Sequence, residues 1–415
     1  MFIKEYLENG IPVVMEPIGN VRSVSAGVWV KVGSRNEHPD KNGISHFLEH
    51  MFFKGTRKRT TKDIAVDIDT IGGDLNAFTS RENTAFYVKV LDEYLDKGLE
   101  LLADVFVNSV FPEEEIEKEK KIIKEEIKMV EDTPDDYIHD LFNQTVWGQT
   151  GLGQTILGRR ETIASFTRDD IMAHIKKYYG TRDIVISCAG NFDTERLIGI
   201  LNKRFGGLRR GSEPQKGGAP DFRQDVRVFT KDLSEAHICI GVPAISQLSE
   251  ERYAFFLLNT ILGAGVSSRL FQEIREKRGL AYSVYSFTSS YVDTGLWGVY
   301  AGVSRKRIRE VAEVVVAEML ALPDTLTETE LERSKKHLKG NLILGLESTS
   351  SRMQNIARQE IYFGRYISPD EIIQSVDRVD MAEVMDLARR LIRRELFSLT
   401  AYGPIQKNVL DDLVG

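Results

Sequence analysis

Residues 43–51, GISHFLEHM, place two histidines four positions apart with a glutamate between them. In a helix, positions i and i+4 lie on the same face, so the imidazoles of His46 and His50 can reach a single metal ion. Glu49 follows His46 by three positions and lies on the same side. Zinc binds neutral histidine nitrogens and carboxylate oxygens, and a catalytic zinc site uses three protein ligands with a fourth position for water. The pattern therefore predicts a zinc site that needs a third ligand from elsewhere in the chain.

The alternative interpretation of this segment is a helix with two solvent-exposed histidines, which would be preferred for an isolated H-x-x-x-H pattern. Here the neighbouring residues 47–48 and 51–53 are large and apolar, so a mostly buried helix is predicted from about Ile44 to Phe53. Buried polar groups cost free energy unless they are bonded, which favours metal binding. Ser45 is expected to cap the helix.

A third ligand is expected in residues 112–132, PEEEIEKEKKIIKEEIKMVED, which read as an amphipathic helix. At about 100° per residue, one apolar stripe is predicted on this helix, made of Ile116, Ile122, Ile123, Ile127 and Val130. Glu119 and Glu126 fall inside the stripe, two turns apart, whereas Glu115 lies at its edge in the first turn and is expected to be solvated. Buried carboxylates need partners. One of Glu119 and Glu126 is therefore expected to bind the metal and the other to support it, and the pattern does not decide which.

Length and composition describe an ordinary folded protein of more than one domain. A chain of 415 residues exceeds the size at which one core stops growing, and 42% of its residues are hydrophobic and 28% charged. The net charge of -7, without a sustained basic block, argues against a nucleic-acid partner. No apolar run is long enough for a membrane span, and the N-terminus lacks the pattern of a signal or transit peptide. We therefore expect a cytoplasmic protein without a membrane partner.

The only two cysteines, Cys188 and Cys239, stand inside apolar runs that are typical of strands. Both are expected to be buried structural thiols, which fits a reducing compartment.

Glycine, proline and charge are densest in residues 205–221, where no apolar face could be buried. This predicts a zinc-binding catalytic domain at 1–210, a linker at 211–222 and a substrate-binding domain without a metal site at 223–415. Each half shows an alternating strand (24–32; 236–242), a helix, a glycine-marked strand region and long amphipathic helices. The shared order suggests a duplicated architecture. Strands and helices mix without strict βαβ alternation, so the predicted fold class is α+β with largely antiparallel sheets.

The remaining elements follow from periodicity and punctuation. A helix is predicted at 62–71, with strands at 75–80 and 84–91; in the second half, helices are predicted at 251–263 and 267–279, with a hairpin at 280–290 and 295–303.

Taken together, these motifs resemble the inverted-zincin (H-x-x-E-H) metallopeptidases, the family of pitrilysin, insulin-degrading enzyme and the mitochondrial processing peptidase. The motifs that carry the resemblance are GISHFLEHMFFKGT at 43–56, GGDLNAFTS at 72–80, and the glutamate pair Glu119 and Glu126. The resemblance covers essentially the whole chain and is closest to the short, two-domain bacterial-type members. It implies two homologous domains, each an antiparallel sheet with packed helices, that face each other around a chamber.

The resemblance also implies roles for the first half. Glu126 would be the third ligand of one Zn²⁺ per chain, and Glu119 would be the supporting carboxylate. The family's substrate-binding strand corresponds to Asn76, Ala77 and Phe78, whose edge would pair with an extended peptide. On the residues alone, this segment reads as an ordinary strand.

The second half lacks any H-x-x-E-H motif but contains Arg275 and Tyr282, which resemble the family's arginine and tyrosine pair that holds substrate and the oxyanion. On the residues alone, Arg275 is a surface charge and Tyr282 a strand aromatic. Because one chain carries both the zinc motif and this pair, a self-sufficient enzyme is expected, as a homodimer.

The expected function is that of a zinc metalloendopeptidase that cleaves unfolded or extended peptides, with Glu49 as general base and Tyr282 polarising the scissile carbonyl. Two alternatives come from other classes: a non-catalytic structural subunit of the same fold, and a module that holds peptides without cleaving them. Metal content together with hydrolysis of an unstructured peptide separates the three.

Overall fold

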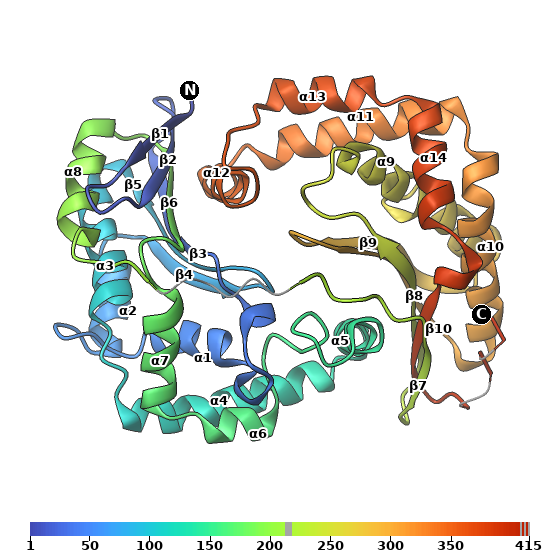
Figure 1. Cartoon of the computed structure of the whole chain (residues 1–415), viewed down its shortest axis with the longest axis horizontal. Coiled ribbons are helices and arrows are strands. Elements are labelled where there is room, and N and C mark those ends of the chain that lie inside the picture. The colour runs from blue at the N-terminus through green and yellow to red at the C-terminus, as the bar shows by residue number, and fades with distance from the viewer. Residues whose placement is uncertain (212–217, 407–408, 411, 414–415) are drawn as a thin grey trace. The chain divides into compact units, whose positions relative to one another are not determined.

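Apolar runs along the chain form the strands of two β-sheets in the computed structural model of the protein, which describes residues 1–211, 218–406, 409–410 and 412–413 (Figure 1). The first sheet has the strand order β1-β2-β6-β3-β5-β4. Only β2 and β6 pair in parallel; the other neighbours are antiparallel. Its strands are β1 (Ile3–Tyr6), β2 (Pro12–Pro17), β3 (Ser23–Val30), β4 (Asp74–Thr79), β5 (Thr84–Leu91) and β6 (Ile184–Gly190).

The second sheet has the order β7-β11-β8-β10-β9, in which only β7 and β11 are parallel. Its strands are β7 (Val226–Thr230), β8 (Ala236–Ala244), β9 (Ala281–Ser290), β10 (Gly295–Val303) and β11 (Ser398–Gly403). The five strands reproduce the pairing of β2, β6, β3, β5 and β4 in order and in direction. The predicted α+β class, with two homologous domains built on largely antiparallel sheets, is confirmed.

The helices lie on both faces of each sheet. In the first half they are α1 (Ile44–Met51), α2 (Thr61–Thr70), α3 (Leu95–Asn108), α4 (Glu113–Glu131), α5 (Pro134–Trp147), α6 (Arg160–Ser165), α7 (Arg168–Tyr178) and α8 (Thr194–Phe205). In the second half they are α9 (Arg252–Gly263), α10 (Ile308–Thr325), α11 (Glu328–Gly345), α12 (Thr349–Phe363), α13 (Pro369–Arg378) and α14 (Met381–Leu391). Three-residue helices occur at Ser34–Asn36, Pro39–Lys41, Asp92–Tyr94, Arg305–Arg307 and Arg394–Leu396.

The helix predicted at 267–279 differs from expectation, because residues Phe271–Lys277 form a π-helix. The wider turn of a π-helix is rare and occurs frequently at functional sites. Apolar periodicity detects the helical character of this segment but does not distinguish a π from an α turn.

The two compact units of the chain do not coincide with the contiguous halves expected from the sequence. Unit 1 comprises Met1–Lys128, Gln154–Gly217 and Gly345–Tyr366, and unit 2 comprises Met129–Gly153, Gly218–Leu344 and Ile367–Gly415. Helix α5 lies within the expected domain 1–210 but belongs to unit 2. Helix α12 lies within the expected domain 223–415 but belongs to unit 1. One unit boundary does fall in the expected linker 211–222, of which residues 212–217 lie outside the described part of the chain.

Helix α12 covers one face of the unit 1 sheet. Its buried residues Met353, Ile356 and Ala357 pack against Val14 and Trp29, together with Ala85, Val185 and Ala189 of the strands. The other face carries the main core with α1, α3 and α8. Because the sheet is covered on both faces, β6 is buried at every position and reads as a continuous apolar run, not as an alternating one. The sequence shows that α12 has an apolar face, but not which sheet buries it.

Helix α5 makes the equivalent contact in unit 2. It packs on β11 and β8, the counterparts of β6 and β3, and buries Phe142 and Trp147 in a cluster with Cys239 and Tyr402. Both cysteines are buried free thiols, as predicted. Among the described residues, no helix combines the length and the apolarity that crossing a membrane requires.

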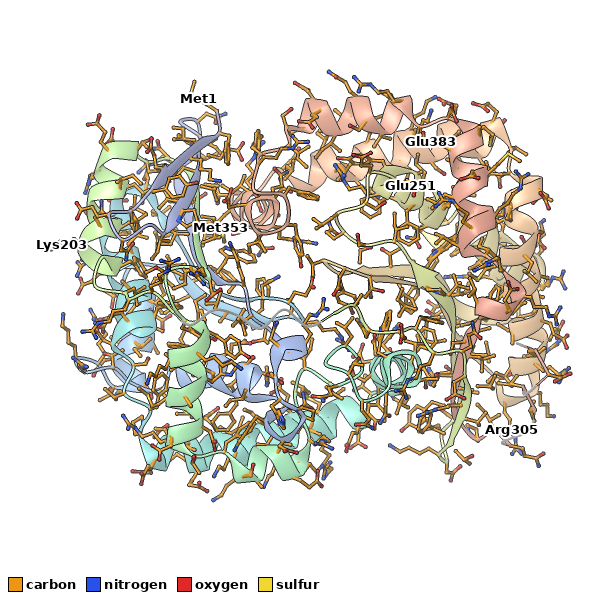
Figure 2. The ribbon with its side chains drawn as sticks, in the orientation of Figure 1. Met1, Lys203, Glu251, Arg305, Met353 and Glu383 are labelled. Atoms are coloured by element: carbon orange, nitrogen blue, oxygen red, sulfur yellow. The ribbon has the colours of Figure 1, made fainter. Side chains whose placement is uncertain are left out.

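The packing of α12 gives a prediction for stability. Met353, labelled in Figure 2, is fully buried, and its sulfur lies 2.8 Å from the point where a Cβ on Gly27 would stand. We expect Met353→Ala to lower the free energy of unfolding of unit 1 by about 2–5 kcal/mol, through lost burial and a residual cavity. Urea unfolding measures the loss. Met172→Ala, at a position that is 40% exposed, is the matched control and should stay within about 0.5 kcal/mol of the wild type. Equal stability of the two variants would contradict the packing of α12 on unit 1.

Candidate metal centre

Helix α1 carries the H-x-x-E-H motif on a short, mostly buried scaffold. Phe47, Leu48 and Met51 are fully buried in the unit 1 core, which fixes one face of the helix. His46, Glu49 and His50 then lie together on the opposite side. The helix ends at Met51, two residues before the predicted end. Ser45, which was expected to cap α1, is instead its second residue, and Gly43 occupies the cap position with a φ of 94°.

Helix α4 brings the acidic partners, as predicted. Ile116, Ile123 and Ile127 are buried and hold the helix on unit 1, with Glu119 buried in the same stripe. Ile122 departs from the prediction, because it is 49% exposed and lies outside the buried stripe. Figure 1 shows α1 and α4 close to each other in this unit.

The three predicted ligands converge. Glu126 Oε1 lies 3.7 Å from His46 Nε2, and its Oε2 lies 3.7 Å from His50 Nε2. One ligand atom of each residue lies within 4.8 Å of the others. Ligand atoms about 2.1 Å from one tetrahedral zinc ion stand roughly 3.4 Å apart. The Glu126 oxygens would therefore need to move only slightly closer to the histidine nitrogens to bind zinc.

Two further observations test whether these residues fit a metal. Glu126 Oε2 is buried and accepts no hydrogen bond from the described residues, so it keeps a free lone pair for an ion. Burial, together with the charge of His50, lowers the pKa of His46 to about 3, which keeps its imidazole in the neutral form that binds metals. The donor set of two imidazoles and one carboxylate is one that zinc prefers.

Glu119 supports His50 and does not belong to the triangle. Its Oε2 lies 3.0 Å from His50 Nδ1, which can donate to it and leave Nε2 free for a metal. Its Oε1 lies 2.7 Å from Lys54 Nζ. Burial alone would raise the pKa of Glu119, but the hydrogen bonds from His50 and Lys54 outweigh it and hold the pKa below its usual value. The carboxylate therefore stays ionised although Glu119 is only 1% exposed.

Glu49 is held beside the ligands by strand β4. Its Oε2 accepts a hydrogen bond of 2.5 Å from Thr79 Oγ1, and α1 packs against β4. Burial raises the pKa of Glu49, although the Thr79 hydroxyl and the charge of His50 act in the opposite direction. A carboxylate with a raised pKa is better suited to accept and return a proton near neutral pH.

The expected substrate residues Asn76, Ala77 and Phe78 lie on β4, the end strand of its sheet, which in the described part of the chain pairs with β5 alone. Phe78 packs edge-on against Trp29 at 5.4 Å between ring centroids. The outer edge of β4 offers backbone groups that can pair with an extended chain. Binding of a peptide there stays a prediction.

Arg275 and Tyr282 belong to unit 2, whereas the metal triangle, Glu49 and β4 belong to unit 1. The guanidinium of Arg275 lies over two aromatic rings, 4.9 Å from the centroid of Phe271 and 4.7 Å from that of Tyr282. Arg275 sits on the π-helix, and Tyr282 is 82% exposed on the edge strand β9. The pair predicted from the sequence is thus a physical contact.

Lys54 and Thr79 contact the carboxylates of the candidate site, Lys54 through an ion pair with Glu119 and Thr79 through a hydrogen bond to Glu49, and neither contact is evident from local sequence patterns. Lys54 lies beyond the end of α1, so helical spacing does not place it, and its ion pair with Glu119 on α4 depends on the fold. Thr79 closes the substrate motif, but its bond to Glu49 depends on the folded sheet.

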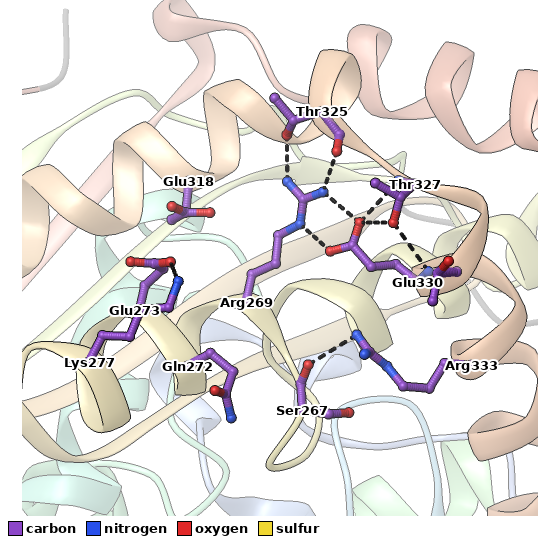
Figure 3. Close-up of a pocket in the computed structure, with 11 residues that line it drawn as sticks. Ser267, Arg269, Gln272, Glu273, Lys277, Glu318, Thr325, Thr327, Glu330 and Arg333 are labelled. Carbon is purple, nitrogen blue, oxygen red and sulfur yellow. Dashed lines mark hydrogen bonds and ion pairs between the residues drawn. The ribbon is translucent and has the colours of Figure 1, made fainter.

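A cavity of about 520 Å³ lies wholly in unit 2 and does not include the predicted site residues (Figure 3). Several of its charged groups have partners: Arg269 pairs with Glu330 at 2.7 Å, Lys277 pairs with Glu273, and Arg333 donates to Ser267 O at 3.2 Å. Burial raises the pKa of Glu318, which also lines the cavity. Among the described residues, the cavity lining contains no cluster of metal-binding side chains comparable to the triangle in unit 1.

Comparison with known proteins gives the family. The profile described as Insulinase (Peptidase family M16) matches residues 13–160, and the profile described as Peptidase M16 inactive domain matches residues 165–338. A protein of Bacillus subtilis named uncharacterized zinc protease YmxG is 42% identical over 97% of this chain and 98% of its own length. The chain belongs to peptidase family M16. The predicted resemblance to a short bacterial-type H-x-x-E-H peptidase is confirmed.

Solved structures share the fold of this M16 chain. A protease from Helicobacter pylori superposes with a TM-score of 0.91 at 23% identity, covering 97% of this chain and 99% of its own. A chain of complex III2 from Candida albicans, in a structure with Inz-5 bound, gives a TM-score of 0.86 at 21% identity, covering 100% and 97%. At these identities the likeness shows the fold alone.

The geometry predicts how the two glutamates of this M16 chain differ. Glu126→Gln removes an anionic ligand and should weaken zinc binding by more than roughly 100-fold, whereas Glu119→Gln removes a supporting partner and should cost about 10–100-fold. Competition with a zinc chelator measures both affinities. Glu125→Gln, an exposed neighbour on α4, is the control and should bind zinc as the wild type does. A larger loss in Glu119→Gln than in Glu126→Gln would reverse the two roles.

Proposed function

We propose that this chain is a zinc metalloendopeptidase that hydrolyses unfolded or extended peptides, with one zinc ion per chain. The observation that carries the proposal is the convergence of His46, His50 and Glu126 with the carboxylate of Glu49 beside them. The names of the family and of its Bacillus relative support zinc and proteolysis.

Each of these residues has a defined part in the proposed reaction. A zinc ion bound by the three ligands would supply Lewis-acid polarisation of a carbonyl and a lowered pKa of water. Glu49 takes the proton from the attacking water and returns it to the leaving amine. The Thr79 hydroxyl orients the Glu49 carboxylate, while Glu119 orients the imidazole of His50.

The proposed substrate class follows from the edge strands. Backbone pairing along β4 requires an extended chain without structure of its own, and Asn76, Ala77 and Phe78 would line it. From unit 2, Arg275 would hold substrate carbonyls and Tyr282 would donate to the developing oxyanion. The chamber that the family resemblance implies stays a prediction.

A non-catalytic subunit or a peptide-holding module would need neither a metal triangle nor a proton acceptor beside it. The presence of both groups supports hydrolysis over these alternatives. The homodimer, the cytoplasmic location and the absence of nucleic-acid and membrane partners remain predictions from the sequence.

The general-base role of Glu49 has a direct test. Glu49→Gln should keep bound zinc, because the residue is assigned proton transfer and no metal contact, and should lower hydrolysis of an unstructured peptide by about 10²–10⁴-fold. Zinc content and peptide turnover are measured on the same preparation. Turnover near that of the wild type would remove the proposed mechanism, and loss of zinc would make Glu49 a ligand.

The proposed roles of Tyr282 and Arg275 predict different kinetic effects. Tyr282→Phe should lower kcat on the order of 10²-fold with little change in peptide affinity, because the hydroxyl acts as charge develops on the carbonyl oxygen. Arg275→Ala should weaken peptide binding. Tyr285→Phe is the matched control on β9, since its hydroxyl lies 3.0 Å from His139 Nε2. If Tyr282→Phe and Tyr285→Phe behave alike, unit 2 does not supply the oxyanion donor.

A further inference from the structure

A buried carboxylate outside the metal triangle lies at the N-terminal end of α1. Glu37 is 7% exposed. Its Oε2 accepts hydrogen bonds from Gly43 N at 2.7 Å and from Asn42 Nδ2 at 3.1 Å, and its Oε1 accepts one from Ser45 N at 2.8 Å. Glu37 thus binds the first turn of the helix with both oxygens.

Helix α1 needs such an external cap. It has only eight residues, and its cap residue, Gly43, has no side chain to satisfy the backbone N–H groups of the first turn. A carboxylate at this end also interacts favourably with the helix dipole. His46 is the third residue of α1 and lies in the capped turn, whereas His50 lies a turn further on.

The backbone around Gly43 leaves little room for another arrangement. A Cβ on Gly43 would stand 2.7 Å from both Gly158 Cα and Leu157 O, and its φ of 94° is strained for other residues. The Asn42 amide donates to Thr155 O at 2.9 Å. The start of α1 is therefore held between Glu37 and residues 155–158.

The segment that carries Glu37 also fixes the turn that follows β4. Ser34 N donates to Ser80 O at 3.1 Å, and Arg35 N donates to Arg81 O at 2.9 Å. A Cβ on Gly33 would stand 2.2 Å from Ser80 O, so the two backbones touch. Because Thr79 immediately precedes this turn and bonds Glu49, residues 33–37 link the support of Glu49 to the start of α1.

Burial of the Glu37 carboxyl group disfavours its charged form. Burial raises the pKa of Glu37 to about 7, and the hydrogen bonds from the Ser45 and Gly43 backbone act in the opposite direction. A buried acid needs compensating hydrogen bonds, and Glu37 accepts them from the first turn of α1, the helix that carries His46 and His50.

We propose that Glu37 is a positioning residue of the metal centre, whose carboxylate fixes the first turn of α1 and with it the direction of His46 relative to His50 and Glu126. The inference rests on the proposed function, because it assumes that these three residues bind zinc. Glu37 is not one of the three predicted metal ligands.

The proposal predicts a graded effect of two substitutions. Glu37→Gln replaces one accepting oxygen by an NH₂ group that faces a backbone donor, so zinc affinity should fall about tenfold or more. Glu37→Asp keeps the charge but is one methylene shorter and cannot reach both Gly43 N and Ser45 N. Its zinc affinity should lie between those of Glu37→Gln and the wild type.

The experiment measures zinc affinity of the full chain by chelator competition, together with the visible spectrum of the cobalt(II)-loaded protein, which reports ligand geometry. Glu16→Gln is the matched control: Glu16 is 9% exposed in the same unit and pairs with Arg352, away from α1. It should lower thermal stability and leave zinc affinity and the cobalt spectrum unchanged. If Glu37→Gln does not fold, Glu37→Asp provides the same comparison.

The outcomes separate this inference from the proposed function. Wild-type affinity in the folded Glu37 variants, with zinc bound normally by the unmodified chain, would overturn the positioning role alone. An equal loss of affinity in Glu16→Gln would also overturn it, because the effect would then be general destabilisation. A wild-type chain that binds no zinc would overturn the proposed function and this inference with it.

Discussion

The geometry of the metal centre depends on a helix that is too short to be stable by itself. Isolated helices below about 12–15 residues are marginal in water, and α1 has eight. Its shape is therefore set by its surroundings: Phe47, Leu48 and Met51 anchor one face in the core, and Glu37 bonds its first turn. The mutual direction of the two histidines follows from this packing, so every structural element that contacts α1 also contributes to the metal centre.

Local sequence patterns were sufficient to find the residues that converge. The spacing of His46, Glu49 and His50 determines that they share a helix face. Apolar periodicity on α4 placed Glu119 and Glu126 in the apolar stripe, where Glu119 is buried and Glu126 is half-buried. The division of roles between these two glutamates came from the family resemblance, and the distances agree with it. Such inferences hold because each depends on periodicity within one element, which the chain imposes before any tertiary contact forms.

Long-range contacts were not accessible in the same way. Glu37, Lys54 and Thr79 act through bonds to partners on other elements. The partner of an apolar helix face is likewise invisible locally, which is why contiguous halves at 1–210 and 223–415 were expected and α5 and α12 were assigned to the wrong units. The two units also differ in sequence at the equivalent helix. Helix α9 follows β8 as α1 follows β3, but its sequence, RYAFFLLNTILG, contains no histidine, cysteine or carboxylate.

The reciprocal placement of α5 and α12 has a consequence for the order of events during synthesis. Unit 1 cannot cover the Trp29 face of its sheet until α12 has left the ribosome. The previous segment of unit 1 ends at position 217, and the segment that contains α12 begins only at position 345. At translation rates of about 5–20 residues per second, the gap lasts on the order of ten seconds. During that interval a nascent chain already contains all three predicted metal ligands, while the sheet that supports them is covered on one face only. Completion of unit 1 is thereby delayed until most of the polypeptide exists.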